Sequence, residues 1–285
     1  MSITIDQVVN DIDQLVSLPN IWVRINDMID SEVCSLNDLG QVISQDPGLT
    51  ARLLGMANSA AFGLRAKVDN VSKAVNVVGL QRLKNLVLAT ASMDAFEGIP
   101  NELVTMENFW QHSIYCGLIA KFLGDQIKMP QSDTLFVAGL LHDLGQLLMF
   151  KLIPDLERQA MMRAVEGVED EDLHTVEKEV IGFDHAMVGG ELAAHWHLPA
   201  MLAETMRCHH DVEQAEHFPK ETAIVNIANC LAVLAELNTT EPDETDAPPI
   251  TPKAWEITGL DDSIIAPAVA FARDQFNEMR SALLP

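Results

Sequence analysis

The residues of this chain with the clearest capacity for chemistry are histidines grouped around one carboxylate. Asp143 directly follows His142 in the segment LLHDLGQ. The other histidines of the set lie on both sides of this pair and are His112, His185, His209 and His210. Imidazole and carboxylate groups are the usual protein ligands for Zn, Fe and Mn. The set therefore predicts a site for one or two divalent ions, and it does not select among these three metals.

Each histidine also has a simpler interpretation. A single histidine inside a protein is most often a hydrogen-bonded core residue, and this alternative stays open for each one taken alone. The two doublets, His142–Asp143 and His209–His210, favour metal binding for the set as a whole. If helices bring them together, two ions about 3.5–4 Å apart could clamp a phosphoryl group and acidify a bridging water.

The remaining histidines have local explanations. His195 and His197 come just before Leu198-Pro199, where a histidine near a helix C-terminus complements the helix dipole. His174 and His217 have polar neighbours and are expected on the surface. The segment 166–179 is crowded with acidic residues, and we expect a solvated loop and helix start there, without a ligand role.

Composition narrows the classes of partner. Among 285 residues, 42 are acidic and 18 are basic, which gives a net charge of −24. A field of this sign repels nucleic-acid backbones and anionic membrane surfaces, and it favours basic protein partners. The sequence therefore predicts no nucleic-acid partner and no membrane partner.

Cysteine usage and hydropathy indicate a cytoplasmic protein. The four cysteines, Cys34, Cys116, Cys208 and Cys230, are isolated, which is typical of reduced thiols. The N-terminal residues MSITIDQVVNDIDQ have neither the basic nor the apolar region of a secretory signal. The longest apolar stretch, 223–237, is too short and too polar to span a bilayer.

Hydrophobic spacing predicts helices throughout the chain. Apolar residues recur at intervals of three and four, whereas runs that alternate with period two are scarce. Asp46-Pro47 has the form of a helix start, and a second helix is expected to begin near Asn70. The tripeptide Gly98-Ile99-Pro100 interrupts the pattern and predicts a boundary between subdomains.

The predicted helices of the second half carry the histidines. His112 lies on a helix expected over about 108–127. Ser132 or Asp133 is expected to cap the next helix, which would reach His142. The residues 238–252, with the acidic run 241–246, read as a linker or loop, and a last amphipathic helix is expected over about 263–283.

Three segments in the first half resemble a known family. LPNIWVRINDMI, DLGQVISQDPGLTARLLGMANSAAFG and VSKAVNVVGLQRLKNLVLATA closely resemble the HDOD domain, the HD-related output domain of bacterial signalling proteins. The resemblance runs from about Leu18 to Asp211. His112 and the His142-Asp143 pair also resemble the HD superfamily of metal-dependent phosphohydrolases. The downstream histidines resemble its HD-GYP branch, whose members hydrolyse cyclic di-GMP.

The resemblance implies an all-α fold with an HD-like helical bundle and a smaller helical N-terminal subdomain. Residues 1–17 are expected to contribute an N-terminal helix. The HDOD domain would span 18–237, divided into the N-terminal subdomain 18–97 and the HD-like bundle 98–237. Residues 238–285 would form an acidic, proline-rich loop and a C-terminal helix.

The chain departs from an active HD enzyme at several positions. The superfamily places a last aspartate ligand where this chain has Asn229, a neutral and weaker ligand. HD-GYP proteins carry lysine where this chain has Gln146 and glutamate where it has Asn108, and the GYP motif is absent after His210. Losing one group that stabilises charge in a transition state typically costs about 3–4 kcal/mol. These changes argue against efficient phosphodiester hydrolysis.

The sequence thus supports one main hypothesis and two alternatives. The main one is a non-catalytic output module of bacterial signal transduction that acts through protein–protein contacts. A degenerate metal site, or a nucleotide ligand bound in its place, would gate it. Because no receiver or GGDEF pattern occurs in this sequence, a partner signalling protein is expected to deliver the signal.

The first alternative is a divergent metal-dependent phosphohydrolase acting on a phosphomonoester or a cyclic dinucleotide. In that case alone Asp143 would be catalytic. The second is a redox- or iron-responsive sensor, since sites rich in histidine can hold iron. The pattern does not predict an oligomeric state.

Overall fold

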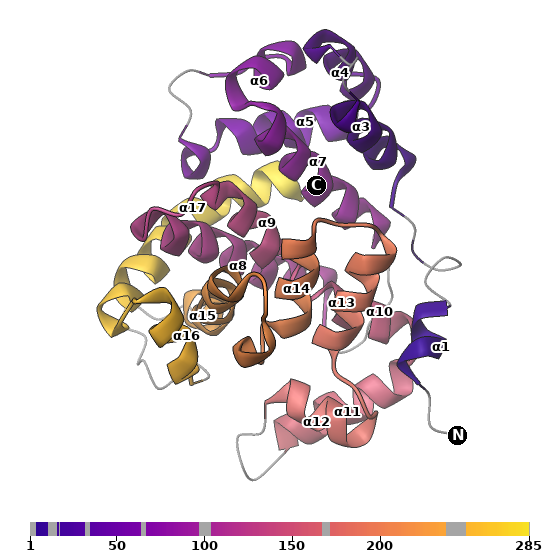
Figure 1. The fold of residues 1–285 in the computed structure, drawn as a ribbon, viewed down its shortest axis with the longest axis vertical. Coiled ribbons are helices and arrows are strands. Elements are labelled where there is room, and N and C mark those ends of the chain that lie inside the picture. Colours follow the sequence, from indigo (N-terminus) through magenta and orange to yellow (C-terminus); the bar gives the residue numbers. More distant parts are fainter. Residues whose placement is uncertain are drawn as a thin grey trace.

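The fold is helical wherever the computed structural model describes the chain. It describes residues 4–10, 16, 18–31, 35–63, 67–96, 104–166, 172–237 and 249–284. These residues form helices and connecting segments, and none of them is in a strand (Figure 1). The predicted all-α class is therefore confirmed. The expectations for Cys34, for the boundary at 98–100 and for the acidic run 241–246 lie outside the described residues.

The helices between residues 20 and 95, which we expect to form an N-terminal subdomain, lie at one end of the molecule (Figure 1). These helices are α3 (Asn20–Asp30), α4 (Leu36–Ile43), α5 (Pro47–Asn58), α6 (Val71–Val78) and α7 (Leu80–Ala95), with the short 3-10 turn η1 (Ala60–Phe62) after α5. The carboxylate of Asp46 accepts the backbone N–H of Leu49 at 2.9 Å, and Asn70 accepts that of Lys73 at 2.8 Å. Both predicted helix starts are confirmed. A separate short helix, α1 (Ile5–Asn10), packs against the opposite part of the chain at α13.

The helices of the expected HD-like bundle follow, and α8 packs against α9, α15 and the later helix α17 (Figure 1). The bundle helices are α8 (Met106–Gln126), α9 (Ser132–Leu141), α10 (Leu144–Leu152), α11 (Pro154–Glu166), α12 (Leu173–Val180), α13 (His185–His195), α14 (Ala200–Cys208) and α15 (Pro219–Glu236), with η2 (Val212–Gln214) before α15. Helices α11 and α12 pair into a hairpin at the far end from the N-terminal subdomain. The chain ends with α16 (Pro252–Thr258), η4 (Asp262–Ile264) and α17 (Ile265–Leu283), and α17 contacts both α8 and α5.

Two glycines permit the close helix contacts that bring the histidines together. A Cβ atom at Gly145, at the start of α10, would lie 2.0 Å from the carbonyl oxygen of His185 on α13. A Cβ at Gly139 on α9 would lie 2.8 Å from the backbone of Cys116 on α8. Any larger residue would separate these helices. The glycines of the HDLG segment and of α9 therefore set the spacing of the site.

The start of α9 differs from the prediction. Neither Ser132 nor Asp133 caps the helix, because its N-cap residue is Gln131, in the left-handed region with φ of 60°. The buried carboxylate of Asp133 instead pairs with Arg82 on α7 and lies 3.6 Å from the ammonium of Lys121 on α8. A residue expected to serve its own helix thus joins the two subdomains.

The segment Ser132–Leu152 is the one described stretch with the length and hydropathy of a membrane span. In the fold it comprises α9 and α10, and 78% of its most apolar window is buried inside the protein. The hydropathy of this segment therefore reflects the core of the bundle.

Candidate metal centre

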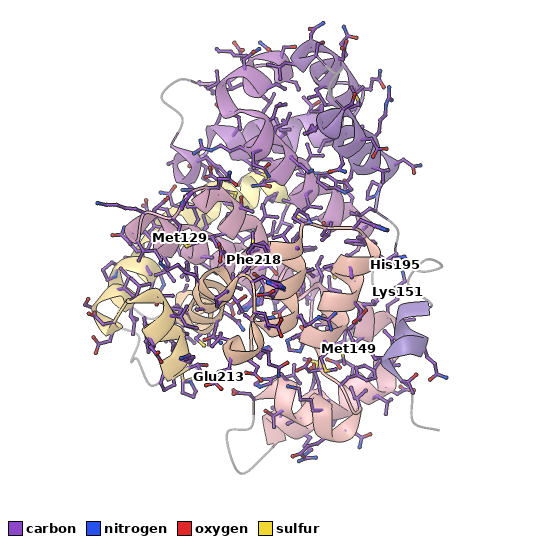
Figure 2. All side chains as sticks on the ribbon, viewed as in Figure 1. Met129, Met149, Lys151, His195, Glu213 and Phe218 are labelled. Carbon is purple, nitrogen blue, oxygen red and sulfur yellow. The ribbon has the colours of Figure 1, made fainter. Side chains whose placement is uncertain are left out.

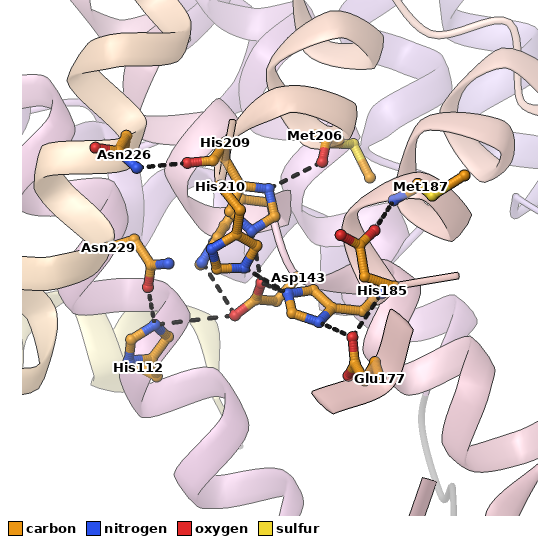
Figure 3. Close-up of polar contacts among 12 residues, drawn as sticks. His112, Asp143, Glu177, His185, Met187, Met206, His209, His210, Asn226 and Asn229 are labelled. Carbon is orange, nitrogen blue, oxygen red and sulfur yellow. Dashed lines mark hydrogen bonds and ion pairs between the residues drawn. The ribbon is translucent and has the colours of Figure 1, made fainter. Parts of the chain in front are cut away.

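Five separate segments contribute the predicted ligands to one place in the bundle (Figure 3). His112 lies on α8, and His142 and Asp143 form the junction between α9 and α10. The remaining predicted ligands are His185 at the first turn of α13, His209 and His210 just after α14, and Asn229 on α15. The structure thus brings all the predicted ligands together.

The carboxylate of Asp143 lies at the centre of the cluster. Its Oδ2 is 3.0 Å from Nε2 of His142 and 3.9 Å from Nε2 of His112. Its Oδ1 is 3.4 Å from Nε2 of both His185 and His209. The ligand atoms form two groups, each within 4.8 Å, namely Asp143, His185, His209 and His210, and His112, His142 and Asp143. One carboxylate is therefore shared between two groups that could each hold an ion.

Hydrogen bonds at Nδ1 orient two of the imidazoles toward this carboxylate. Nδ1 of His142 lies 2.8 Å from the carbonyl oxygen of Gly139, and Nδ1 of His209 lies 2.9 Å from that of Met206. A carbonyl oxygen can only accept, so Nδ1 donates in both rings and Nε2 is directed at Asp143. Such bonds fix the tautomer of metal-ligating histidines.

A carboxylate performs the same role for His185. Oε2 of Glu177 accepts a hydrogen bond from Nδ1 of His185 at 2.7 Å and from its backbone N–H at 2.8 Å. Nε2 of His185 then lies 2.8 Å from Nε2 of His210. Two imidazole nitrogens thus meet beside Oδ1 of Asp143, within the second ligand group.

Unpartnered polar atoms test whether this site fits a metal ion. Nε2 of His142, Nε2 of His209 and Oδ1 of Asp143 are buried, and none of them has a hydrogen-bond partner among the described residues. Each such atom typically costs about 1–3 kcal/mol. One cation in each ligand group would satisfy all three, at Nε2 of His142 in the first group and at Nε2 of His209 and Oδ1 of Asp143 in the second. Their imidazole and carboxylate chemistry suits Zn, Fe or Mn. The residues present therefore fit a metal centre.

The buried carboxylate of Asp143 changes the pKa of the histidines around it. Burial lowers the pKa of His142, but the adjacent Asp143 carboxylate and the Cys116 side chain together outweigh it, so the pKa of His142 rises to about 10. Burial, with the neighbouring charges of His142 and His185, lowers the pKa of His209 to about 4. The carboxylate thus holds one proton on His142, at a place where a bound ion would supply the positive charge.

Asn229 changes the environment of His112. Nε2 of His112 lies 2.9 Å from Oδ1 of Asn229, and Nδ1 lies 2.7 Å from Oε1 of Glu236. Both partners accept, so both ring nitrogens donate. Burial lowers the pKa of His112, but Glu236 and Asp143 together raise it above its ordinary value. His112 therefore offers its Nε2 lone pair less readily than His209, whose pKa is lowered, does.

The other two departures lie near the site. Gln146 is half-buried in the first turn of α10, three residues after Asp143. Asn108 is exposed on α8, one turn before His112, and its backbone N–H is capped by Thr105. Neither residue supplies a charge to the site.

Two expectations for the segment 166–179 are wrong. The acid-rich segment contains Glu177, whose side chain is 0% exposed and holds His185. His174 is half-buried, and its ring stacks on that of His210 with centroids 4.1 Å apart and planes at 7°. The spacing of Leu173, Val176, Glu177 and Val180 is the signal that could have revealed Glu177, because it places this carboxylate on the apolar face of α12.

The histidines assigned local roles lie elsewhere. His195 is the last residue of α13, the opposite end from His185, as predicted (Figure 2). His217 is exposed, also as predicted. Cys116, Cys208 and Cys230 are buried free thiols.

A helical bundle with a His-Asp junction at its centre defines a domain of the HD class. The sequence model of the HDOD domain matches residues 15–212, and the chain belongs to this family. The match includes every predicted ligand except Asn229, which lies beyond it on α15.

One curated protein is similar to this chain in sequence. An uncharacterized protein of Treponema pallidum (strain Nichols) is 31% identical over 221 residues, which cover 76% of this chain and 42% of that protein. The chain thus spans less than half the length of this curated relative.

Solved structures share the fold. A "Putative phosphohydrolase" from Shewanella amazonensis SB2B is 24% identical, with a TM-score of 0.76 and 97% of both chains covered. An HDOD domain protein with unknown function from Geobacter sulfurreducens is 23% identical, with a TM-score of 0.73 and 97% of this chain and 96% of that chain covered.

Proposed function

We propose that this protein is a non-catalytic output module of signal transduction whose degenerate HD site binds one or two divalent ions. The ion or ions would set the conformation of the bundle, and the output would be contact with another signalling protein. The second ligand group, with Asp143, His185, His209 and His210, is the stronger site in this proposal. A nucleotide bound at the same place is the other ligand that the site chemistry allows.

The observation that carries the proposal is the contact between His112 and Asn229. The amide oxygen of Asn229 lies 2.9 Å from Nε2 of His112 and brings no charge. An aspartate here would add an anionic ligand to the first group. With an amide in its place, that group has Asp143 as its only carboxylate. A weakened first group argues against a two-ion centre able to bind and activate a phosphoester.

The charge of the molecule supports a protein partner. The net charge of −24 favours a basic protein surface and opposes nucleic acid and anionic membranes. Cysteines without CxxC spacing agree with a location in the cytoplasm.

Metal content and hydrolysis, measured on the same preparation, test the proposal. The protein should be purified without chelator or histidine tag, beside Asp143→Ala and the exposed-histidine control His217→Ala. We expect about one or two ions per chain in the wild type and the control, and none in Asp143→Ala. We expect no hydrolysis of cyclic di-GMP or of phosphomonoesters by any of them. Turnover that Asp143→Ala abolishes would refute the non-catalytic role.

A divergent metal-dependent phosphohydrolase is the second candidate. The shared carboxylate of Asp143 favours it, because ions in both groups would lie side by side. When bound, such ions supply Lewis acidity and a water of lowered pKa. The chain would contribute the orientation of the imidazoles, through Gly139, Met206 and Glu177. A phosphoester screen with added Mn²⁺, Zn²⁺ or Fe²⁺ separates the two candidates.

A further inference from the structure

The C-terminal helix α17 closes the end of α15 with one arginine. The guanidinium of Arg273 donates to the carbonyl oxygen of Leu234 at 2.7 Å and to that of Ala235 at 3.1 Å, and it also bonds to that of Leu237. The last carbonyl groups of a helix have no partners within the helix itself. Arg273 therefore supplies the hydrogen-bond donors that the carbonyl groups in the last turn of α15 lack.

That last turn carries the residue that holds His112. Glu236 is the final residue of α15, and its Oε1 accepts a hydrogen bond from Nδ1 of His112 at 2.7 Å. The Glu236 side chain is 30% exposed, so packing alone does not fix it. Its position depends on the backbone of the turn, which Arg273 binds on both sides of Glu236.

Helix α17 is itself held at several points. The ring of Phe276 stacks on Tyr115, three residues after His112 on α8, with centroids 4.2 Å apart and planes at 12°. Glu278 accepts the backbone N–H of Ala60 at 3.1 Å, and Ala282 packs directly on Gly55 of α5. Arg273 therefore projects from a helix anchored on both subdomains.

We propose that Arg273 is a positioning residue for the ligand His112, acting through the last turn of α15 and Glu236. Its guanidinium binds the carbonyl oxygens of the last turn of α15, so the proposed effect passes through the backbone of 234–237. The inference rests on the proposed function only in taking His112 as a ligand. It also gives a reason why residues beyond the family match matter to the site.

The test is the imidazole NMR spectrum of the full chain without metal. Arg273→Ala is compared with Arg273→Lys, with Glu236→Gln and with Arg280→Ala. Arg280 is a matched control, because it lies on the same helix and pairs at 2.6 Å with the exposed carboxylate of Glu107 on α8 instead of with the last turn of α15. We expect the ring ¹⁵N and ¹H signals of His112 to move in Arg273→Ala and in Glu236→Gln. Arg273→Lys should restore them in part, and Arg280→Ala should leave them unchanged.

Several results would overturn the proposal. Unchanged His112 signals in Arg273→Ala, or in Glu236→Gln, would show that Arg273 does not position His112 through Glu236. Equal movement of His112, His142 and His209 signals would indicate a general loosening of the bundle. If Arg273→Ala fails to fold, the His112 signals of Arg273→Lys are compared with those of the wild type. Lysine keeps a cation but cannot reach three carbonyl groups at once, so these signals should still move in part.

A metal titration separates this inference from the proposed function. In Arg273→Ala we expect Mn²⁺ to bind the first ligand group about 10–100-fold more weakly, the range for loss of an outer support of a ligand. Binding to the second group should be unchanged. A wild-type protein that binds no ion would refute the proposed metal site, and the NMR comparison would still decide the role of Arg273. Equal weakening at both groups would refute the positioning role.

Discussion

Replacing Asp143 by asparagine is the sharpest test of the site, because one carboxylate serves both ligand groups. Asp143→Asn keeps the shape of the side chain and removes its charge. The oxygens it changes lie 3.0–3.9 Å from Nε2 of four histidines. We therefore expect a single substitution to remove both ions, whereas His112→Ala should affect the first group and His209→Ala the second.

The expected magnitude follows from linkage. An ion at about 100 times its dissociation constant stabilises the folded state by about 2.7 kcal/mol. For a chain of this size, each kcal/mol raises the melting temperature by about 2–4 °C. The wild type should thus gain about 5–11 °C from the tighter ion alone, and Asp143→Asn should gain nothing.

The assay is thermal unfolding with chelator and with added Mn²⁺ or Zn²⁺, with His217→Ala as the control. In chelator, Asp143→Asn should also be less stable by about 1–3 kcal/mol, since His142 loses its charged partner. A metal-induced shift in Asp143→Asn equal to that of the wild type would refute the reasoning. A loss of the shift in His217→Ala would show that the effect is not specific to the cluster.

Three further predictions concern the residues around the ligands. Asn229→Asp should raise the affinity of the first group for Mn²⁺ at least about tenfold, about 1.4 kcal/mol, because it adds an anionic ligand, and calorimetry would detect this. Glu177→Gln should weaken the second group by about tenfold, since the amide holds His185 less strongly, and an unchanged titration would contradict this. Burial and the Glu177 carboxylate raise the pKa of Glu157 from 4.5 to about 9, so the folded state favours its protonated form. Glu157 should therefore lower the free energy of unfolding as pH rises between these values, by up to about 1.4 kcal/mol per pH unit. Urea unfolding at pH 5 and pH 8 would check this. Glu157→Gln should be more stable than the wild type at the higher pH only.

Local signals were enough for the helices and for most of the cluster. Asp46 and Asn70 cap the helices that their residue types predict, since an N-cap depends on contacts within one turn. The ligand set was also recognisable, because doublets such as His142–Asp143 are rare enough to indicate a site. The prediction that Ser132 or Asp133 caps α9 failed, because the Asp133 carboxylate pairs with Arg82 on α7 instead.

The supports of the site were not recognisable from local signals. Glu236 bonds to His112 across 124 positions of sequence, and Arg273 reaches α15 from a helix that follows it by more than 25 residues. Glu177 was read as a solvated residue, because an acid-rich neighbourhood hides one buried carboxylate.

The sequence by itself determined the helical class, the helix starts at Asp46 and Asn70 and the set of candidate ligands, because these follow from residue type and short-range spacing. Only the tertiary structure decided that one carboxylate serves two ligand groups and that the amide oxygen of Asn229 accepts a hydrogen bond from Nε2 of His112. It also decided that α17 binds the end of α15, which carries Glu236. These depend on which helices meet and at what distance, and that is set by packing contacts such as the one at Gly145.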